Sequence, residues 1–178
     1  MSKALQLTLA ILKPDVVSRP HIVQQIKQII RNDGFYFIKS KTCYLPRSKA
    51  EEFYEEHEGR FFHNRLVTFM SSGQVSAHIL ARYDAIICWR KLMGPTKVLK
   101  TVHEEPESIR GTFGSTDTRN ATHGSDSEES AEREINFFFP DFNIKEWYRT
   151  EEQLFREGNV KFCEEQDKHV IIDDNHIK

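Results

Sequence analysis

The chain has 178 residues, of which 38% are hydrophobic and 29% charged, and its formal net charge is −2. These values predict one globular domain and argue against a protein that coats nucleic acid, which needs a surplus of Lys and Arg. No apolar run approaches the ~18 residues of a membrane span. The three cysteines form no CxxC pair, and no secretory or Arg-rich leader is visible. We therefore expect an intracellular protein, cytoplasmic or mitochondrial, without a cleavable signal and without nucleic acid or membrane as a partner.

Alternation of apolar and polar residues from Leu5 to Ile11 predicts a first strand, which Pro14 ends. A helix follows, with Ser18 as its cap and Pro20 in its first turn, and Gly34 favours its end. Aromatic and β-branched residues predict a second strand over 35–45. The same reasoning predicts, in chain order, a helix over 48–57 capped by Ser48-x-x-Glu51, a helix over 61–70, a strand over 75–81, a helix over 84–93, a loop over 95–122 and a helix over 127–138.

Strands that alternate with helices through short links predict an α/β sandwich, with the strand order left open. Residues 151–178 carry eight acidic and four basic side chains, which is typical of a solvated tail. Two short apolar runs, 160–162 and 170–172, could instead pair or dock on the domain as strands. We expect a domain over 1–150 and an acidic C-terminal extension over 151–178.

The long loop ends in the run Arg-Asn-Ala-Thr-His-Gly-Ser-Asp-Ser over residues 119–127. One interpretation makes this run a helix entrance, with Ser125-x-x-Glu128 as a capping box and His123 as an ordinary polar residue. The other makes His123 a nucleophile, because a neutral imidazole attacks phosphorus well near pH 7. That chemistry needs one ring nitrogen held and the other free. Glu134, about two turns into the next helix, is the best candidate to hold the ring.

A phosphate ligand also requires cations, and the chain offers Lys13 after the first strand, Arg90 on a helix and Arg110 in the loop. Each of them could equally be a solvated surface charge. Neither common Gly-rich phosphate loop is present. The remaining histidines show no spacing typical of metal ligands.

Four motifs follow one another along the chain: Leu-Lys-Pro-Asp at 12–15, Arg-Phe-Phe at 60–62, Ile-Arg-Gly at 109–111 and Asn-x-x-His-Gly-Ser-Asp at 120–126. They occur in the order seen in nucleoside diphosphate kinases, and the chain resembles this family from residue 5 to about 148. Within it, the chain looks most like the divergent type-6 branch. The resemblance implies a ferredoxin-like fold, an α+β sandwich with a four-stranded antiparallel sheet covered by helices.

The resemblance also implies a reaction and a role for each matching residue. The γ-phosphate of an NTP would pass to an NDP through phosphorylated His123, with Mg²⁺ held mainly by the nucleotide phosphates and by no dedicated protein site. The implied roles are support of the nucleophile by Glu134 and Ser125, contact with the sugar hydroxyl and nearby phosphate by Lys13 and Asn120, a place beside the histidine for Tyr54, phosphate binding by Arg90, Thr96 and Arg110, and base stacking by Phe62. Core packing is the alternative for Phe62 and Tyr54.

Three features depart from the family pattern. The segment between Thr96 and Arg110 is longer than in common members, Asp117 stands where many members have an apolar residue, and the chain continues past 155. These differences predict a dimer or weaker assembly rather than a hexamer. They also leave open a nucleotide-binding regulatory protein with weak activity. A third possibility, a ferredoxin-like RNA-binding module, lacks the required aromatic motif and charge.

Overall fold

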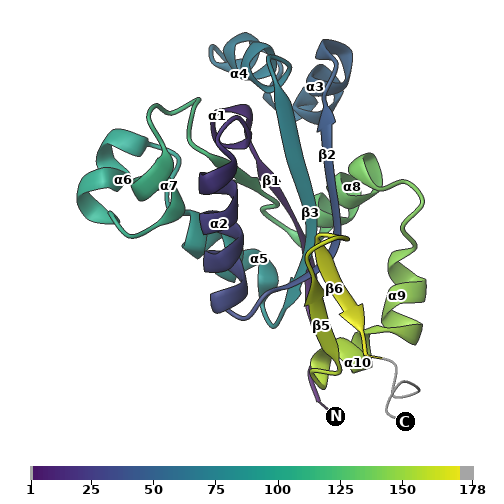
Figure 1. Cartoon of the computed structure of the whole chain (residues 1–178). Coiled ribbons are helices and arrows are strands. Elements are labelled where there is room, and N and C mark those ends of the chain that lie inside the picture. The colour runs from purple at the N-terminus through teal and green to yellow at the C-terminus, as the bar shows by residue number, and fades with distance from the viewer. Residues whose placement is uncertain (1, 173–178) are drawn as a thin grey trace.

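The structure is a computed structural model that describes residues 2–172. Its main sheet is antiparallel with strand order β2-β3-β1-β4, the ferredoxin-like arrangement, which confirms the expected fold (Figure 1). The strands are β1 (Gln6–Leu12), β2 (Tyr36–Tyr44), β3 (Gln74–Arg82), β4 (Thr122–Gly124), β5 (Val160–Cys163) and β6 (Lys168–Ile171). The helices are α1 (Pro14–Val17), α2 (Pro20–Asn32), α3 (Arg47–Phe53), the 3₁₀ turn η1 (Glu55–His57), α4 (His63–Met70), α5 (Ala85–Met93), α6 (Val98–Glu104), α7 (Ile109–Phe113), α8 (Glu128–Phe138), α9 (Ile144–Thr150) and α10 (Glu152–Arg156). Over the described residues, none of these helices has the length and apolar character needed to cross a bilayer.

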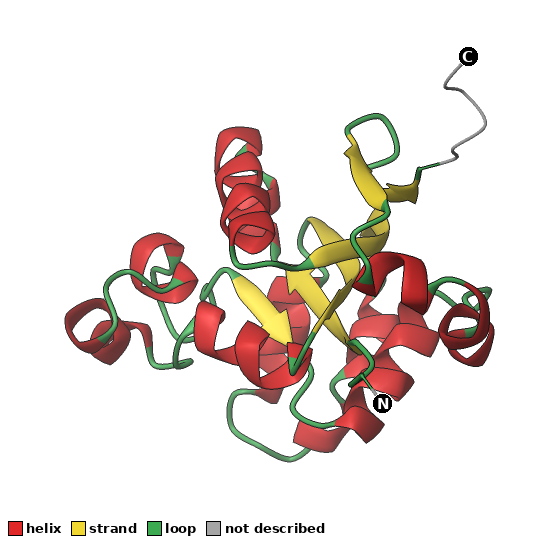
Figure 2. Ribbon diagram, turned by 90° about the horizontal axis from the view of Figure 1, so that it is seen from below, coloured by secondary structure: helices red, strands yellow, loops and turns green. Residues whose placement is uncertain are grey.

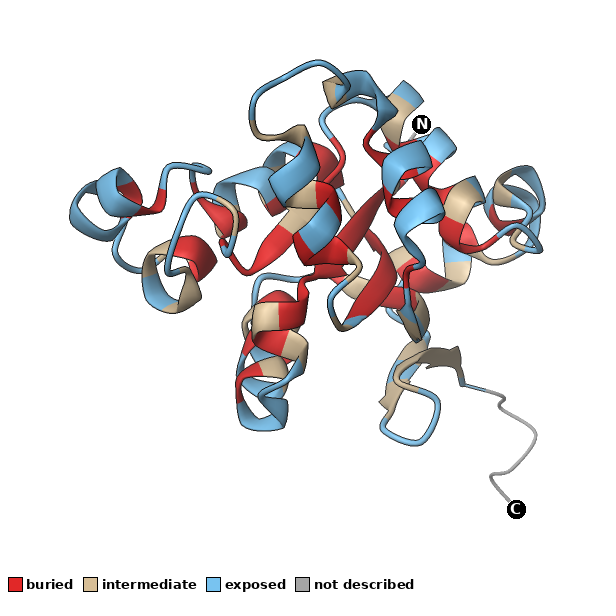
Figure 3. Ribbon diagram, turned by 90° about the horizontal axis from the view of Figure 1, so that it is seen from above, coloured by how far each residue is buried: buried red, intermediate tan, exposed pale blue. Residues whose placement is uncertain are grey.

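The alternation in β1 divides the core between the two faces of the sheet. Leu9 and Ile11 pack on the face covered by α3, α4, α8, α9 and α10. Ala10 and Leu12 pack on the other face, against α1, α2, α5 and α7. Figure 2 shows the strands between the two layers of helices, and Figure 3 shows buried residues along the strands and exposed residues on the outer sides of the helices. Because β1 is central and buried on both faces, its C-terminal end is a fixed point on which a site can be built.

Several local predictions need correction. The expected loop over 95–122 contains α6 and α7 and ends at the first residue of β4, and these short runs give no clear periodicity in the sequence. Ser48 lies inside α3, which begins at Arg47 without a side-chain cap. The cap of α8 is Ser127, whose side chain accepts a hydrogen bond from the Ser130 amide, rather than Ser125. Ser125 is therefore not the cap of α8, and its side chain can make other contacts.

The two apolar runs of the tail pair with each other, as predicted, and form the β5–β6 hairpin. The hairpin docks beside β2, where His169 Nδ1 accepts a 2.8 Å hydrogen bond from the Phe37 amide. Lys27 of α2 forms a 2.7 Å ion pair with Asp167 at the hairpin turn. Figure 1 shows the hairpin against the lower end of the sheet. Residues 173–178 of the predicted extension lie outside the described residues, and the division of the chain at residue 150 stays a prediction.

Candidate active site

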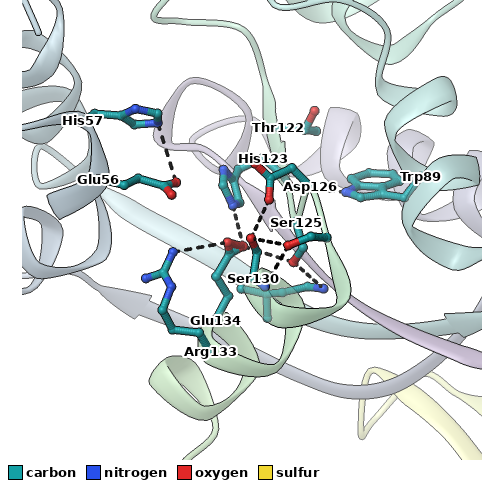
Figure 4. Close-up of polar contacts among 12 residues, drawn as sticks. Glu56, His57, Trp89, Thr122, His123, Ser125, Asp126, Ser130, Arg133 and Glu134 are labelled. Atoms are coloured by element: carbon teal, nitrogen blue, oxygen red, sulfur yellow. Dashed lines mark hydrogen bonds and ion pairs between the residues drawn. The ribbon is translucent and has the colours of Figure 1, made fainter.

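His123 lies at the middle of β4, opposite Ile11 of β1, and its ring is held by α8 (Figure 4). Nε2 of His123 lies 2.7 Å from Oε1 of Glu134. The side chain of Glu134 is only 3% exposed, whereas that of His123 is 21% exposed. Ser125 donates a 3.1 Å hydrogen bond to the same carboxylate oxygen and accepts one from the Leu9 amide. The predicted contact between Glu134 and the histidine is therefore present, and Ser125 connects it to the central strand.

This arrangement decides which nitrogen of His123 is available. A carboxylate oxygen accepts, so Nε2 must carry the proton and donate it. Nδ1 then keeps its lone pair, and no hydrogen bond to it is found among residues 2–172. One nitrogen is thus oriented and the other is free, which is the requirement for a nucleophilic imidazole.

The backbone of β4 is fixed on the side opposite Glu134. The indole Nε1 of Trp89 donates a 3.2 Å hydrogen bond to the carbonyl of His123. A Cβ placed on Gly124 would lie 2.5 Å from the Trp89 ring, so only glycine allows this close approach. Ala121 has a φ of 73°, a strained value for alanine that turns the chain into β4. The backbone on either side of His123 is therefore held in place by contacts with neighbouring elements.

Lys13 follows β1 and is buried next to this turn. Its Nζ donates a 2.7 Å hydrogen bond to Oδ1 of Asn120, and Asp15 accepts one from the Ala121 amide. Burial first, and then the charge of Arg110, lower the pKa of Lys13 to about 7, while Asp15 opposes the shift. The low pKa of this buried amine is typical of a site at which a bound anion would stabilise the charged form.

Arg110 of α7 is buried and donates to two backbone carbonyls, those of Gly94 and Thr122, at 2.7 and 2.8 Å. Its Nε has no partner within the described residues, and the same is true of the buried hydroxyl of Tyr54. Burial and the neighbouring charge of Arg90 lower the pKa of Arg110 to about 10. Unpaired buried donors are costly unless a ligand satisfies them, so both atoms are suited to an oxyanion.

The three residues predicted to bind phosphate line one hollow of about 440 Å³. Arg110 forms its buried wall, while Arg90 and Thr96 are exposed at its rim. Glu105, from the longer segment between α6 and α7, also lines the hollow. Two of the predicted cations, Arg90 and Arg110, thus line one hollow together with the carboxylate of Glu105.

The two predicted aromatic residues belong to a chain of ring contacts that begins at the nucleophile. The ring centroid of Tyr54 lies 5.9 Å from that of His123, and His57 lies 6.2 Å from Tyr54. The half-buried ring of Phe62 follows at 5.3 Å from His57. Tyr54 is buried in the core, as the alternative interpretation held, yet it also contacts the nucleophile.

Asp117 does not lie in the 440 Å³ hollow. It lines a separate hollow of about 840 Å³ between α4 and residues 115–119, which contains no other predicted site residue. Its Oδ1 accepts a 3.0 Å hydrogen bond from the Val98 amide, and its carbonyl accepts one from Asn120. Asp117 therefore has a structural role, because it connects the start of α6 to the segment that carries Asn120.

Three residues near the site, Asp15, Trp89 and His57, are not among those predicted from the sequence. Asp15 stands in the Leu-Lys-Pro-Asp motif and Trp89 precedes Arg90, so adjacency to predicted residues was the available signal. No signal pointed to His57. Within residues 2–172, no group of three or more His, Cys, Asp and Glu side chains could hold a metal ion. A divalent cation at this site would therefore need ligands from a bound anion.

The comparisons with known proteins agree with this geometry. The family model described as nucleoside diphosphate kinase matches residues 6–144. Nucleoside diphosphate kinase 6 of Danio rerio is 52% identical over 169 residues, covering 95% of this chain and 96% of the relative, and that of Homo sapiens is 50% identical over 95% and 91%. The solved structure of the Aquifex aeolicus nucleoside diphosphate kinase superposes with a TM-score of 0.72 at 40% identity, covering 76% of this chain and 96% of the other. The chain therefore belongs to the nucleoside diphosphate kinase family.

Proposed function

We propose that the chain transfers the γ-phosphate of an NTP, typically ATP, to an NDP in two half-reactions through phosphorylated His123. The observation that carries the proposal is the oriented ring of His123, with Nε2 on Glu134 and no partner for Nδ1 among the described residues. Tyr54 contacts this ring and also neighbours the buried Arg110. In the first half-reaction Nδ1 attacks the γ-phosphorus. The N–P bond forms as the P–O bond to the β-phosphate breaks, and the NDP leaves. In the second, a terminal oxygen of another NDP attacks the phosphorus and releases Nδ1.

Each neighbouring residue has a role in this scheme. The ring of His123 becomes positive as the N–P bond forms, and the carboxylate of Glu134, supported by Ser125, stabilises that charge. Arg110, Arg90 and Thr96 bind the phosphates, and the unpaired Arg110 Nε supplies one donor. The Tyr54 hydroxyl supplies another. Lys13 and Asn120 contact the sugar hydroxyl and the phosphate next to it, and Phe62 stacks on the base, which suits many bases because each has a π-face.

Mg²⁺ would be held mainly by the nucleotide phosphates. This arrangement suits Mg²⁺, which usually keeps waters and needs few protein ligands. When bound, it would neutralise charge on the β- and γ-phosphates.

A nucleotide-binding regulatory protein with weak activity is the second candidate. Glu105 favours it, because this carboxylate lines the hollow in which phosphates would bind and would repel them. If it restrains the enzyme, Glu105→Gln should raise kcat/KM for the nucleotide. An unchanged value would remove the observation that favours this candidate.

One incubation with γ-labelled ATP tests the main proposal. The chain should become labelled, and the label should be lost in acid and kept in alkali, because phosphohistidine is acid-labile and base-stable. An acid-stable label would indicate a phosphoserine or phosphothreonine and would contradict the role of His123. No label at all would favour the regulatory candidate.

We also propose an assembly no larger than a dimer. The β5–β6 hairpin covers part of β2, an edge strand of the main sheet, and an edge strand is the position at which a second copy of a chain can pair. The α6–α7 segment adds further surface near the site. The hairpin thus reduces the surface available for contacts between subunits, and the longer α6–α7 segment changes its shape near the site.

A further inference from the structure

His57, at the end of the 3₁₀ turn η1, lies beside the site but has no part in the scheme above. Its ring is stacked on Tyr54, with 22° between the planes, and Tyr54 in turn packs edge-on against His123. Its side chain is 35% exposed, so solvent can reach it. Figure 4 shows His57 and Glu56 on one side of His123, with Trp89 on the other. The fold thus places a second titratable imidazole on the far side of Tyr54 from His123, one ring away from the proposed nucleophile.

The charged and titratable groups around His57 come from three elements. On its own segment, Glu56 lies 3.9 Å from Nε2, and Arg60 follows in the next turn. His63 faces it from α4 and His123 from β4. Burial lowers the pKa of His57 most, Glu56 raises it, and Arg60, His123 and His63 lower it further, for a net decrease. His57 is therefore neutral at pH 7 while His123 carries no phosphoryl group.

We propose that His57 takes up a proton when His123 is phosphorylated, and that its positive charge then stabilises the phosphorylated chain. The inference rests on the proposed function. A phosphoryl group brings a charge of about −1.5 to −2 at pH 7. That charge adds to the carboxylate of Glu56, and two negative neighbours favour the protonated imidazole. The proton comes from solvent and takes no part in making or breaking the N–P bond, so His57 is a positioning residue.

A histidine suits this role better than a permanent cation would. It is uncharged when His123 is free, so it adds no attraction that would hold the NTP formed in the second half-reaction. It becomes charged only in the state that needs neutralising. The interaction crosses a partly exposed gap, so we expect an effect of about three- to tenfold on the phosphorylation equilibrium.

The first test measures that equilibrium at pH 6 and pH 8. Intact-mass spectrometry would give the phosphorylated fraction at a fixed ATP:ADP ratio for the wild-type chain and for His57→Gln, His57→Lys and His21→Gln. His21 is exposed at the start of α2, and its variant is the matched control. We expect the wild type to exceed His57→Gln about three- to tenfold at pH 6 and to equal it at pH 8. His57→Lys should exceed His57→Gln at both values. Lys13 and Glu56 are common to all variants, so their titration cancels in these ratios.

A second measurement does not need enzymatic activity. Phosphoramidate phosphorylates histidine chemically, and NMR of ring-labelled histidine reports the protonated fraction of His57 at pH 7. That fraction should rise several-fold after treatment of the wild type and should not rise in His123→Ala. If ATP fails to label the chain but this rise occurs, the proposed function is wrong and the inference about His57 holds. If ATP labels the chain but the ratio of wild type to His57→Gln is the same at both pH values, or the rise is absent, the inference is overturned.

Discussion

His123 and His78 both lie on strands of the main sheet, but only His123 keeps a free ring nitrogen. His78 on β3 is fully buried, and its Nδ1 and Nε2 each lie 2.7 Å from a serine hydroxyl, those of Ser40 and Ser76. The proton of Ser40 is donated to the Asp167 carbonyl, so Ser40 must accept from Nδ1–H, and Nε2 accepts from Ser76. Burial lowers the pKa of His78 to about 3 and keeps the ring neutral.

The difference shows that the surroundings decide what an imidazole does. Two short hydroxyl partners and complete burial make His78 a structural group that contacts no solvent. One carboxylate partner and partial exposure leave His123 with the oriented, accessible ring that its proposed role requires. Each of the following experiments tests one side of this contrast.

Replacement of the nucleophile should have the largest effect. His123→Ala should abolish labelling by γ-labelled ATP and phosphate exchange, because a covalent nucleophile has no substitute. The variant should still fold, with a lower thermal unfolding midpoint, because the buried carboxylate of Glu134 loses one donor and keeps that of Ser125. His21→Ala is the matched control and should keep full exchange. Exchange by His123→Ala at near the wild-type rate would contradict the central proposal.

The two arginines should separate binding from structure. Arg110→Ala and Arg90→Ala should each lower kcat/KM for the nucleotide about 10²-fold or more, because each removes charge from the phosphate site. Arg110→Ala should also lower the free energy of unfolding, since the carbonyls of Gly94 and Thr122 lose their donor. Arg90 is exposed, so Arg90→Ala should leave stability unchanged. If kcat/KM is unchanged in both variants, the phosphates bind elsewhere.

The structural histidine should affect stability and leave the chemistry alone. His78→Ala should lower the free energy of unfolding by about 2–4 kcal/mol, because it opens a cavity and leaves the buried Ser76 and the half-buried Ser40 with one partner fewer each. The kcat of the folded fraction should remain that of the wild type. Loss of kcat without loss of stability would make His78 part of the site.

The same histidine sets an acid limit. The folded pKa of about 3 is below the unfolded value near 6.5, so the stability that His78 contributes is complete above pH 6.5 and is lost as the pH falls. By pH 5 the loss should be about 1–2 kcal/mol in denaturant unfolding. His78→Gln should lack this component.

Lys13 should give the site its own pH dependence. Its pKa of about 7 means that the amine is charged below pH 7 and neutral above it. The kcat/KM, which reports the free enzyme, should therefore fall up to about tenfold per pH unit above 7. Lys13→Arg keeps its charge and should show a flatter profile, even if its absolute rate is lower. A wild-type profile that is flat from pH 7 to 9 would show that Lys13 does not contact the phosphates.

The hairpin should produce the smallest change. Asp167→Asn removes the ion pair with Lys27 but keeps the backbone bond to Ser40, and asparagine tolerates the φ of 52° at this position. It should lower the free energy of unfolding by about 1 kcal/mol without altering exchange.

In sedimentation the wild-type chain should be a dimer or smaller. A stable hexamer would contradict the proposed limit on assembly.

The sequence predicts the long elements of the fold well, because their apolar periodicity runs over many residues. It also predicts the contact of Glu134 with His123, since the helical rise places residue 134 two turns beyond the start of α8. It does not predict β4, because three residues are too few to show alternation. Two serines two residues apart both fit a helix cap, and only the burial of Ser125 against Glu134 decides between them. His78 is equally invisible, because a single histidine in an apolar strand gives no sign of its partners.

The hydrogen bonds under the hairpin also have a consequence for the order in which the chain is made. Ser40 of β2 hydrogen-bonds to Asp167, which lies 127 positions later in the chain, and Phe37 to His169, which lies 132 positions later. During synthesis β2 and β3 leave the ribosome long before those partners exist. Until then Ser40 has no acceptor from the hairpin, and the Phe37 amide on the edge of β2 lacks its hydrogen-bond partner. The nascent chain must therefore carry an unfinished sheet edge through most of its translation, which is the interval in which a chaperone or a second nascent chain would find it open.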